Sequence, residues 1–117
     1  FLVNIAIGTN YDIIAKCRMD IEMARLLCLK AAWMMDQGDQ RAAAPWISQI
    51  KVVAPNVALS VIAEAVQMFG GEGISQDTPL ARMWTHVRTL RLADGPDAVH
   101  RRQVARWELA KHTQQKV

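Results

Sequence analysis

The sequence predicts one all-α domain, an antiparallel four-helix bundle. Three observations support this fold. Apolar side chains recur every three or four residues over long stretches, which is the period of an amphipathic helix. Short groups of Gly, Pro and Asp separate these stretches. The 117 residues suffice for one domain with a modest core, and amphipathic helices with short joints bury their apolar stripes best as an antiparallel bundle.

The first predicted helix covers residues 10–37. Thr9 is the expected N-cap, and Gly38 is expected to end the helix as a C′ glycine. Glu22 and Arg25 have the spacing of an ion pair on the helix surface. The predicted buried stripe consists of residues three or four positions apart, namely Ile13, Cys17, Ile21, Ala24, Cys28, Ala31 and Met35.

The second predicted helix begins between residues 40 and 45 and ends at residue 69. Pro45 suits its first turn. Pro55 lies inside the apolar pattern, where it removes one backbone hydrogen bond and is expected to kink the helix. The two glycines that follow the helix are expected to stop it.

The third predicted helix covers about residues 79–92, with Asp77 or Thr78 as its cap. The fourth begins at Pro96 or Asp97 and ends near residue 112. Proline fits a first helical position, and an aspartate favours the positive end of the helix dipole. The expected apolar face of the fourth helix consists of Val99, Val104, Trp107 and Leu109.

The chain is mildly basic, with a net charge of +3, and most of the excess follows residue 80. This balance suits an anionic ligand without requiring one. Nucleic-acid binding is not expected, because the arginines lack interleaved exposed aromatic residues and a known reading motif. No metal site is expected, since the three histidines share no metal-ligand spacing. The four tryptophans are interpreted as core or subunit-contact aromatics.

A glycine-rich motif, QMFGGEGIS, covers residues 67–75. Glycines let a backbone approach another molecule closely and expose its N–H groups. The spacing is not that of the dinucleotide-binding fingerprint, and no strand precedes it. The motif is therefore either a helix C-cap with a loop or a ligand contact. The polar Gln67, at an otherwise apolar helix end, favours the ligand contact.

A second motif, LADGPDAV, covers residues 92–99. In it, Asp94 precedes a Gly-Pro pair at the predicted junction of two helices. One interpretation is an N-cap or turn carboxylate. The other is a general base in an apolar pocket. The local sequence leaves both open.

Taken in order, IEMARLL, AVQMFGGEG, a Pro-initiated helix and LRLADGPDAV resemble the C-terminal domain of the acyl-CoA dehydrogenase family. The similarity covers about residues 10–110 and is greatest to the large multidomain members numbered ten and eleven. Residues 1–9, FLVNIAIGT, match the family poorly and are expected to be an N-terminal extension or an artificial boundary. Residues 10–117 are then the helical bundle domain.

The resemblance implies a flavin enzyme in which FAD lies between a middle domain and this one and reaches a neighbouring subunit. Two groups of residues are then expected to contact FAD. The first, which would meet the neighbour's adenine and pyrophosphate, is Gln67, Met68, Phe69, Gly70 and Gly71. The second is Pro96, Asp97 and Ala98. Asp94 is implied as the candidate catalytic base and Gly95 as a substrate contact.

The implied reaction is α,β-dehydrogenation of acyl-CoA thioesters in fatty-acid β-oxidation. A carboxylate removes the α-proton while the β-hydride goes to the flavin. The family usually has Glu where Asp94 stands and Thr where Pro96 stands, so both the reach of the base and one set of FAD contacts change here. Some members place the base on an upstream helix, which this chain does not contain.

The resemblance also implies self-association as a homodimer or homotetramer, missing N-terminal and middle domains, and electron-transfer flavoprotein as the electron acceptor. The expected location is mitochondrial or peroxisomal. Alone, the chain is expected to be inactive. Two alternatives are a non-catalytic helical oligomerisation or interaction module and part of an acyl-CoA oxidase-like flavoenzyme. A folded, self-associating protein without flavin would favour the first, and oxygen reactivity would identify the second.

Overall fold

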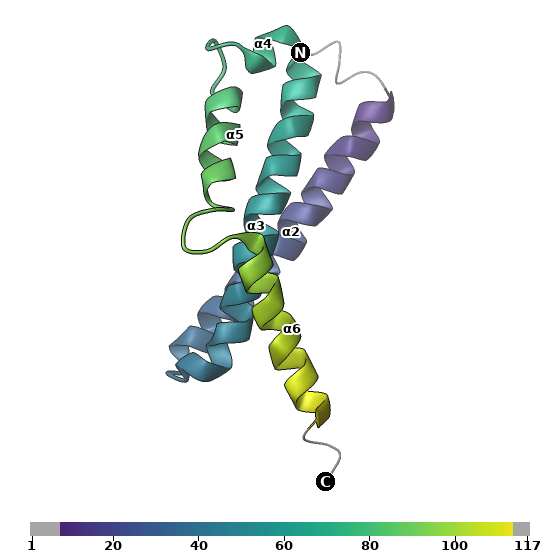
Figure 1. Ribbon diagram of the computed structural model, residues 1–117. Coiled ribbons are helices and arrows are strands. Elements are labelled where there is room, and N and C mark those ends of the chain that lie inside the picture. The colour runs from purple at the N-terminus through teal and green to yellow at the C-terminus, as the bar shows by residue number, and fades with distance from the viewer. Residues whose placement is uncertain (1–7, 114–117) are drawn as a thin grey trace.

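Residues 8–113 are described by a computed structural model, and they fold into helices joined by short loops (Figure 1). In chain order the elements are α2 (Gly8–Asp36), α3 (Gln40–Phe69), α4 (Gly71–Ile74), α5 (Leu80–Thr89) and α6 (Asp97–Thr113). The regular structure within these residues is entirely helical. The predicted all-α fold is therefore confirmed.

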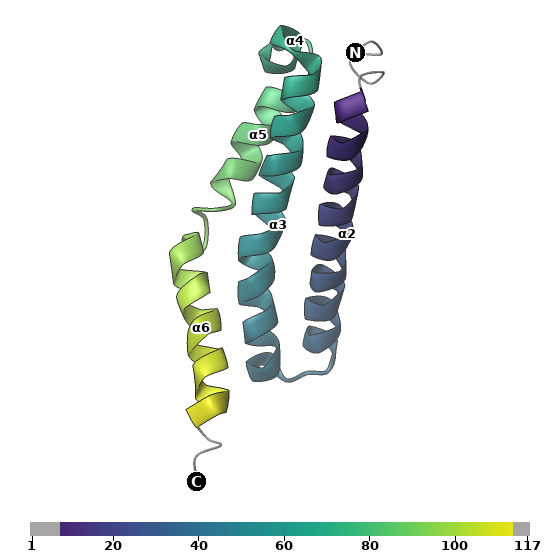
Figure 2. The same ribbon diagram turned by 90° about the vertical axis from the view of Figure 1, so that its right-hand side faces the viewer.

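Helix α3 is the central element of the domain. Among residues 8–113, α3 packs against all four other helices, whereas α2 packs against α3 alone. Helices α5 and α6 follow one another along α3, on a different side from α2, and all three run antiparallel to α3 (Figures 1 and 2). The antiparallel arrangement is thus confirmed, with α5 and α6 together covering one length of α3.

The core is small and rich in alanine. Its buried apolar residues are Ala24, Ala31, Ala43, Leu59 and Ile62. The first two confirm the centre of the predicted α2 stripe, and most other members of that stripe are half-buried. Met35 is 45% exposed, so its predicted burial is wrong. It lies in the last turn of α2, at the end of the hairpin, where less of the neighbouring helix is available to cover it.

The α2–α3 connection is defined by its caps. Gly38 has φ +79° and donates its N–H to the Met35 carbonyl at 3.0 Å, as predicted for a C′ glycine. Asp39 is the N-cap of α3, because its carboxylate accepts hydrogen bonds from the backbone N–H groups of Arg41 and Ala42. Pro45 therefore lies beyond the first turn of α3, contrary to the prediction.

Two other cap predictions are wrong. Helix α2 already includes Gly8, so Thr9 lies within the helix rather than before it. Pro79 precedes α5, and the Thr78 hydroxyl instead donates to the carbonyls of Glu72 and Gly73. Thr78 thus closes the loop back onto α4, a short helix that the sequence did not predict.

Helix α3 continues through Pro55 as one helix. It is the helix within residues 8–113 that is long and apolar enough, by length and composition alone, to cross a membrane. Its central position explains that composition, because a helix with neighbours on several sides needs apolar residues on several sides.

The predicted apolar face of α6 is only partly correct. Val104 and Trp107 are half-buried, whereas Val99 and Leu109 are exposed. A helix that packs against a single neighbour covers only one stripe of its surface, and α6 has only α3 beside it within the described residues.

Among the tryptophans, Trp46 and Trp107 are half-buried, whereas Trp33 and Trp84 are exposed, so the core interpretation is wrong for the last two. The alternative of subunit contacts stays a prediction.

Helix α2 carries a second apolar stripe that faces away from α3. We call it the outer stripe of α2. Its exposed members are Tyr11, Met19, Met23, Leu26, Leu29 and Trp33. At about 100° per residue, these positions lie opposite the stripe that packs on α3. Exposed apolar surface of this extent is typical of an interaction face.

Candidate functional site

The α5–α6 junction holds Asp94 in an unusual backbone conformation. Asp94 has φ +54° and Gly95 has φ +104°. A positive φ is uncommon for a residue with a side chain, although aspartate tolerates it better than most. The Asp94 side chain is exposed, and no hydrogen bond or ion pair described within residues 8–113 uses its carboxylate. The carboxylate is therefore available to a ligand.

The N-cap interpretation of Asp94 is not supported by this geometry. Helix α6 begins at Asp97, and Val99 donates its N–H to the Pro96 carbonyl at 2.9 Å. Asp94 lies before these residues, outside the reach of a cap. It is a turn carboxylate in a left-handed conformation.

Lys51 of α3 ties the junction to the centre of the domain. Its ammonium donates to the carbonyl of Ala93 at 2.6 Å and also to the carbonyl of Leu90. These carbonyls follow the end of α5, where a positive charge also complements the helix dipole. The ring Nε2 of His100, on α6, lies 3.2 Å from the Asp94 carbonyl. Side chains from two helices, α3 and α6, therefore contact the backbone carbonyls of Ala93 and Asp94.

Asp97 is buried, and its carboxylate points into the domain. It accepts hydrogen bonds from Arg91 at 2.8 Å and from Asn56 at 3.1 Å, and it forms a 2.7 Å ion pair with the Arg91 guanidinium. All three contacts are made to Oδ2, so the Asp97 side chain is held within the domain and has a structural role. The sequence missed this role because Asn56 is far from Asp97 along the chain.

The pKa of Asp97 follows from these contacts. Burial alone would raise the pKa of this carboxyl. The hydrogen bonds from Asn56 and Arg91, with the positive charges of Arg91 and Arg101, outweigh burial and hold the pKa below its ordinary value. Asp97 is thus an ionised structural carboxylate at neutral pH.

The glycine-rich motif lies where α3 ends and α4 begins. Gly70 has φ +64°, donates its N–H to the Gln67 carbonyl and accepts from the N–H of Gly73. Gln67, Gly70 and Gly71 are exposed, while Met68 and Phe69 are half-buried. A Cβ on Gly71 would meet nothing within 4 Å. This open backbone is compatible with the predicted approach of a ligand.

Gly73 has a different purpose within the same motif. A Cβ there would lie 2.6 Å from the Val66 carbonyl oxygen, closer than real Cβ atoms come. Gly73 is buried against α3 and lets the chain reverse direction. The motif thus combines one packing glycine with two exposed ones.

The structure does not bring the two predicted groups of site residues together. Gln67 is sixteen residues beyond Lys51 on α3, which corresponds to about 24 Å along the axis. Figure 1 shows α4 at one end of the domain and the α5–α6 loop near the middle of α3. Two separate contact regions are therefore expected on one molecule.

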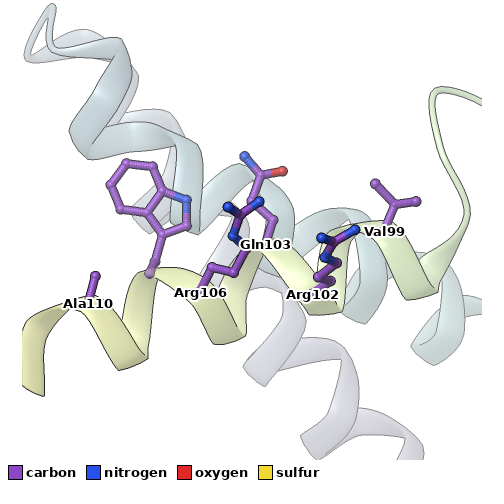
Figure 3. A pocket seen from close by; sticks show the side chains of 6 residues that line it. Val99, Arg102, Gln103, Arg106 and Ala110 are labelled. Carbon is purple, nitrogen blue, oxygen red and sulfur yellow. The ribbon is translucent and has the colours of Figure 1, made fainter. Parts of the chain in front are cut away.

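A groove on α6 was not predicted. It measures about 420 Å³ and is lined by Val99, Arg102, Gln103, Arg106, Trp107 and Ala110 (Figure 3). Within residues 8–113, neither of its arginines has an ion-pair partner. The basic excess after residue 80 was a signal for such a surface, although it did not locate it.

These observations define an all-α domain with a candidate acid–base residue at a helix junction. Comparison with known proteins identifies its family. The family model described as "Acyl-CoA dehydrogenase, C-terminal domain" matches residues 12–109. The chain belongs to this family.

Several relatives are highly similar over most of this chain. Acyl-CoA dehydrogenase family member 11 of Gallus gallus is 53% identical over 96 residues, which is 82% of this chain and 12% of that protein. Family member 10 of Mus musculus is 50% identical over 102 residues, 87% of this chain and 10% of that protein. The resemblance to members ten and eleven is therefore confirmed.

Solved structures give the same result. A Mycobacterium abscessus protein assigned to the acyl-CoA dehydrogenases superposes with a TM-score of 0.89 at 51% identity, over 92% of this chain and 26% of that chain. An electron transferring flavoprotein of Acidaminococcus fermentans gives a TM-score of 0.83 at 28% identity, over 90% of this chain and 27% of that chain. This chain thus spans about a quarter or less of the length of these relatives.

Proposed function

We propose that this chain is the FAD- and subunit-contacting C-terminal domain of a flavin-dependent acyl-CoA dehydrogenase. The whole enzyme would perform α,β-dehydrogenation of acyl-CoA thioesters in fatty-acid β-oxidation. The observation that carries the proposal is the exposed Asp94 carboxylate, which lies in a left-handed turn at the α5–α6 junction of a family member.

The residues at the α3–α4 turn fit a dinucleotide. The exposed Gln67 amide can hydrogen-bond an adenine edge, and the open face of Gly71 lets a pyrophosphate approach the backbone. Met68 and Phe69 are half-buried and support this turn from α3. When bound, FAD supplies the acceptor for the hydride.

The α6 start would contribute fewer side-chain contacts. Pro96 and Ala98 are exposed, whereas the Asp97 carboxylate is occupied by Arg91 and Asn56. Proline also lacks the N–H and the hydroxyl of the family's usual threonine. Cofactor binding here would rely on the backbone N–H groups in the first turn of α6 and on packing against the proline ring.

Asp94 would act on the substrate in two ways. Its carboxylate would take the α-proton, and its backbone N–H would donate to the thioester carbonyl. No backbone hydrogen bond described within residues 8–113 uses that N–H. A donor at the carbonyl oxygen lowers the α-proton's pKa. Gly95 has no side chain, so its backbone would line the acyl chain.

The outer stripe of α2 supports self-association or contact with the enzyme's other domains. In this proposal the chain works as a homodimer or homotetramer with N-terminal and middle domains, and electron-transfer flavoprotein is the electron acceptor. The proposed location is mitochondrial or peroxisomal. The same stripe would also suit a non-catalytic helical interaction module, which is the second candidate function.

The test is to purify the whole protein that carries this sequence and to mix it anaerobically with a panel of acyl-CoAs. Bleaching of bound flavin by at least one acyl-CoA would support the proposal. Bound flavin that no acyl-CoA bleaches would contradict it. A flavin-free, self-associating protein would favour the interaction module, and rapid reoxidation by oxygen would indicate an oxidase. The isolated 117-residue chain should bind FAD weakly or not at all.

A further inference from the structure

Asp94 and Gly95 occupy a conformation that the local chain does not favour by itself. Positive φ angles at two consecutive residues, one of them with a side chain, need support from their surroundings. Within residues 8–113, the carboxylate of Asp94 makes no described contact that could provide this support. The support must therefore come from contacts made to the backbone of the loop.

Two side chains, each from a different helix, contact that backbone. Lys51 of α3 bonds the carbonyl immediately before Asp94, and His100 of α6 lies against the carbonyl of Asp94 itself. The His100 ring also lies over the bare face of Gly95, since a Cβ there would be 3.2 Å from Nε2. Because a carbonyl only accepts, a hydrogen bond at this contact requires the proton on Nε2.

We propose that Lys51 and His100 are positioning residues that set the direction of the Asp94 carboxylate. This inference rests on the proposed function, in which Asp94 is the base. Neither residue needs to touch the substrate. Together they fix the two carbonyls that bracket the Cα of Asp94, so the side chain leaves the loop in one direction.

The position of the base matters more here than with a glutamate. Aspartate is one methylene shorter, so it has one fewer rotatable bond with which to correct an error in backbone position. A misplacement of about 1 Å can cost on the order of 100-fold in rate. A shorter base therefore requires a more firmly held loop, and the Lys51 and His100 contacts supply it.

The alternative is that Lys51 is only a C-terminal cap of α5. A cap would contribute to stability without affecting proton abstraction. The two roles differ in their kinetics. Loss of a cap lowers the melting temperature, whereas loss of a positioning contact lowers kcat at saturating substrate and leaves KM little changed.

The experiment uses the whole flavin-loaded protein and compares Lys51→Met, Lys51→Arg and the control Lys16→Met, which removes an exposed lysine of α2. The rate of anaerobic flavin bleaching is measured with ordinary and α-deuterated acyl-CoA. Hydrogen exchange of residues 90–97 is measured with and without flavin. We expect Lys51→Met to lower the bleaching rate at saturating acyl-CoA roughly 10- to 100-fold, to increase the α-deuterium isotope effect and to accelerate exchange in this loop. Lys51→Arg should recover most of the rate, and Lys16→Met should change nothing.

Other results would overturn the proposal. Faster exchange in Lys51→Met with an unchanged bleaching rate would leave Lys51 as a structural cap. Unchanged hydrogen exchange of residues 90–97 in Lys51→Met would show that the loop keeps its conformation without Lys51. If Lys51→Met does not fold, His100→Gln, which keeps a donor, must bleach faster than His100→Leu. Wild-type protein that binds flavin but bleaches with no acyl-CoA would instead refute the proposed function, and the positioning of a base with it.

Discussion

Arg91 and Asp97 form an ion pair of 2.7 Å that joins the two ends of the loop containing Asp94. The pair is shielded, since the Asp97 side chain is only 8% exposed. Asn56 adds a bond from α3, so the loop is closed on itself and attached to the central helix. The stability of the junction should therefore depend on one ionised carboxylate.

Asp97→Asn should destabilise the domain by about 1–3 kcal/mol at neutral pH, because Arg91 loses its charged partner. The effect should depend on pH. The pKa of Asp97 is lower in the folded protein than in the unfolded chain, so its stabilisation is present above about pH 4 and is lost as pH falls through the folded pKa. Urea denaturation at pH 7 and pH 3 measures this. Asp77→Asn, at an exposed loop residue, is the control, and an Asp97→Asn variant equally destabilised at both pH values would contradict the account.

Asp39→Ala should destabilise α3 by about 1 kcal/mol, since two backbone N–H groups lose their acceptor. Asp36→Ala is the matched control. That carboxylate lies at the C-terminal end of α2, where it opposes the helix dipole, so its removal should be neutral or slightly stabilising. Chemical denaturation of both variants provides the comparison. Equal losses from both would mean that Asp39 does not act as a cap.

Gly73→Ala and Gly71→Ala should have different effects. The first places a Cβ against a backbone carbonyl at 2.6 Å and should cost about 1–3 kcal/mol of stability. The second enters open space and should leave the melting temperature unchanged. In the whole protein, Gly71→Ala should nevertheless reduce the flavin content after purification. Full flavin retention in that variant would argue against a cofactor contact at this turn.

Met23→Lys combined with Leu26→Lys should reduce self-association, because both residues lie on the exposed outer stripe of α2. Sedimentation velocity over a range of concentrations measures the change. Gln76→Lys, on an exposed loop, adds the same type of charge elsewhere. If the double variant and the Gln76→Lys control both associate like the wild type, the outer stripe is not an interaction surface.

The sequence predicted the helices better than their ends. The period of apolar residues was enough for α2, α3 and α6, because each is long. Helix α3 begins at Gln40, the early end of the predicted range of residues 40 to 45, but its N-cap, Asp39, was missed because Pro45 was assigned to the first turn. The third helix was predicted to reach residue 92. In fact the chain leaves α5 at Thr89 and continues as turns, whose carbonyls accept hydrogen bonds from Lys51.

The candidate site was predictable only in part. The motif around Asp94 pointed to the junction, because Gly-Pro after a carboxylate is a local signal. The contacts that hold it were not predictable, since Lys51 and Asn56 come from the middle of α3 and lie near the junction only after folding. The FAD-contact and substrate residues remain predictions. The predicted domain boundaries also remain predictions, and residues 1–7 and 114–117, at the two ends of the chain, lie outside the described residues.

The most direct test of the central claim is to compare wild-type protein with Asp94→Asn, both as whole flavin-loaded chains, in anaerobic stopped-flow mixing with an acyl-CoA. Asparagine keeps the size of the side chain and tolerates a positive φ, but it cannot accept the α-proton. If Asp94 is the base, Asp94→Asn retains flavin and the wild-type melting temperature while flavin bleaching is lost. Equal bleaching by both proteins would contradict it and place the base elsewhere in the enzyme.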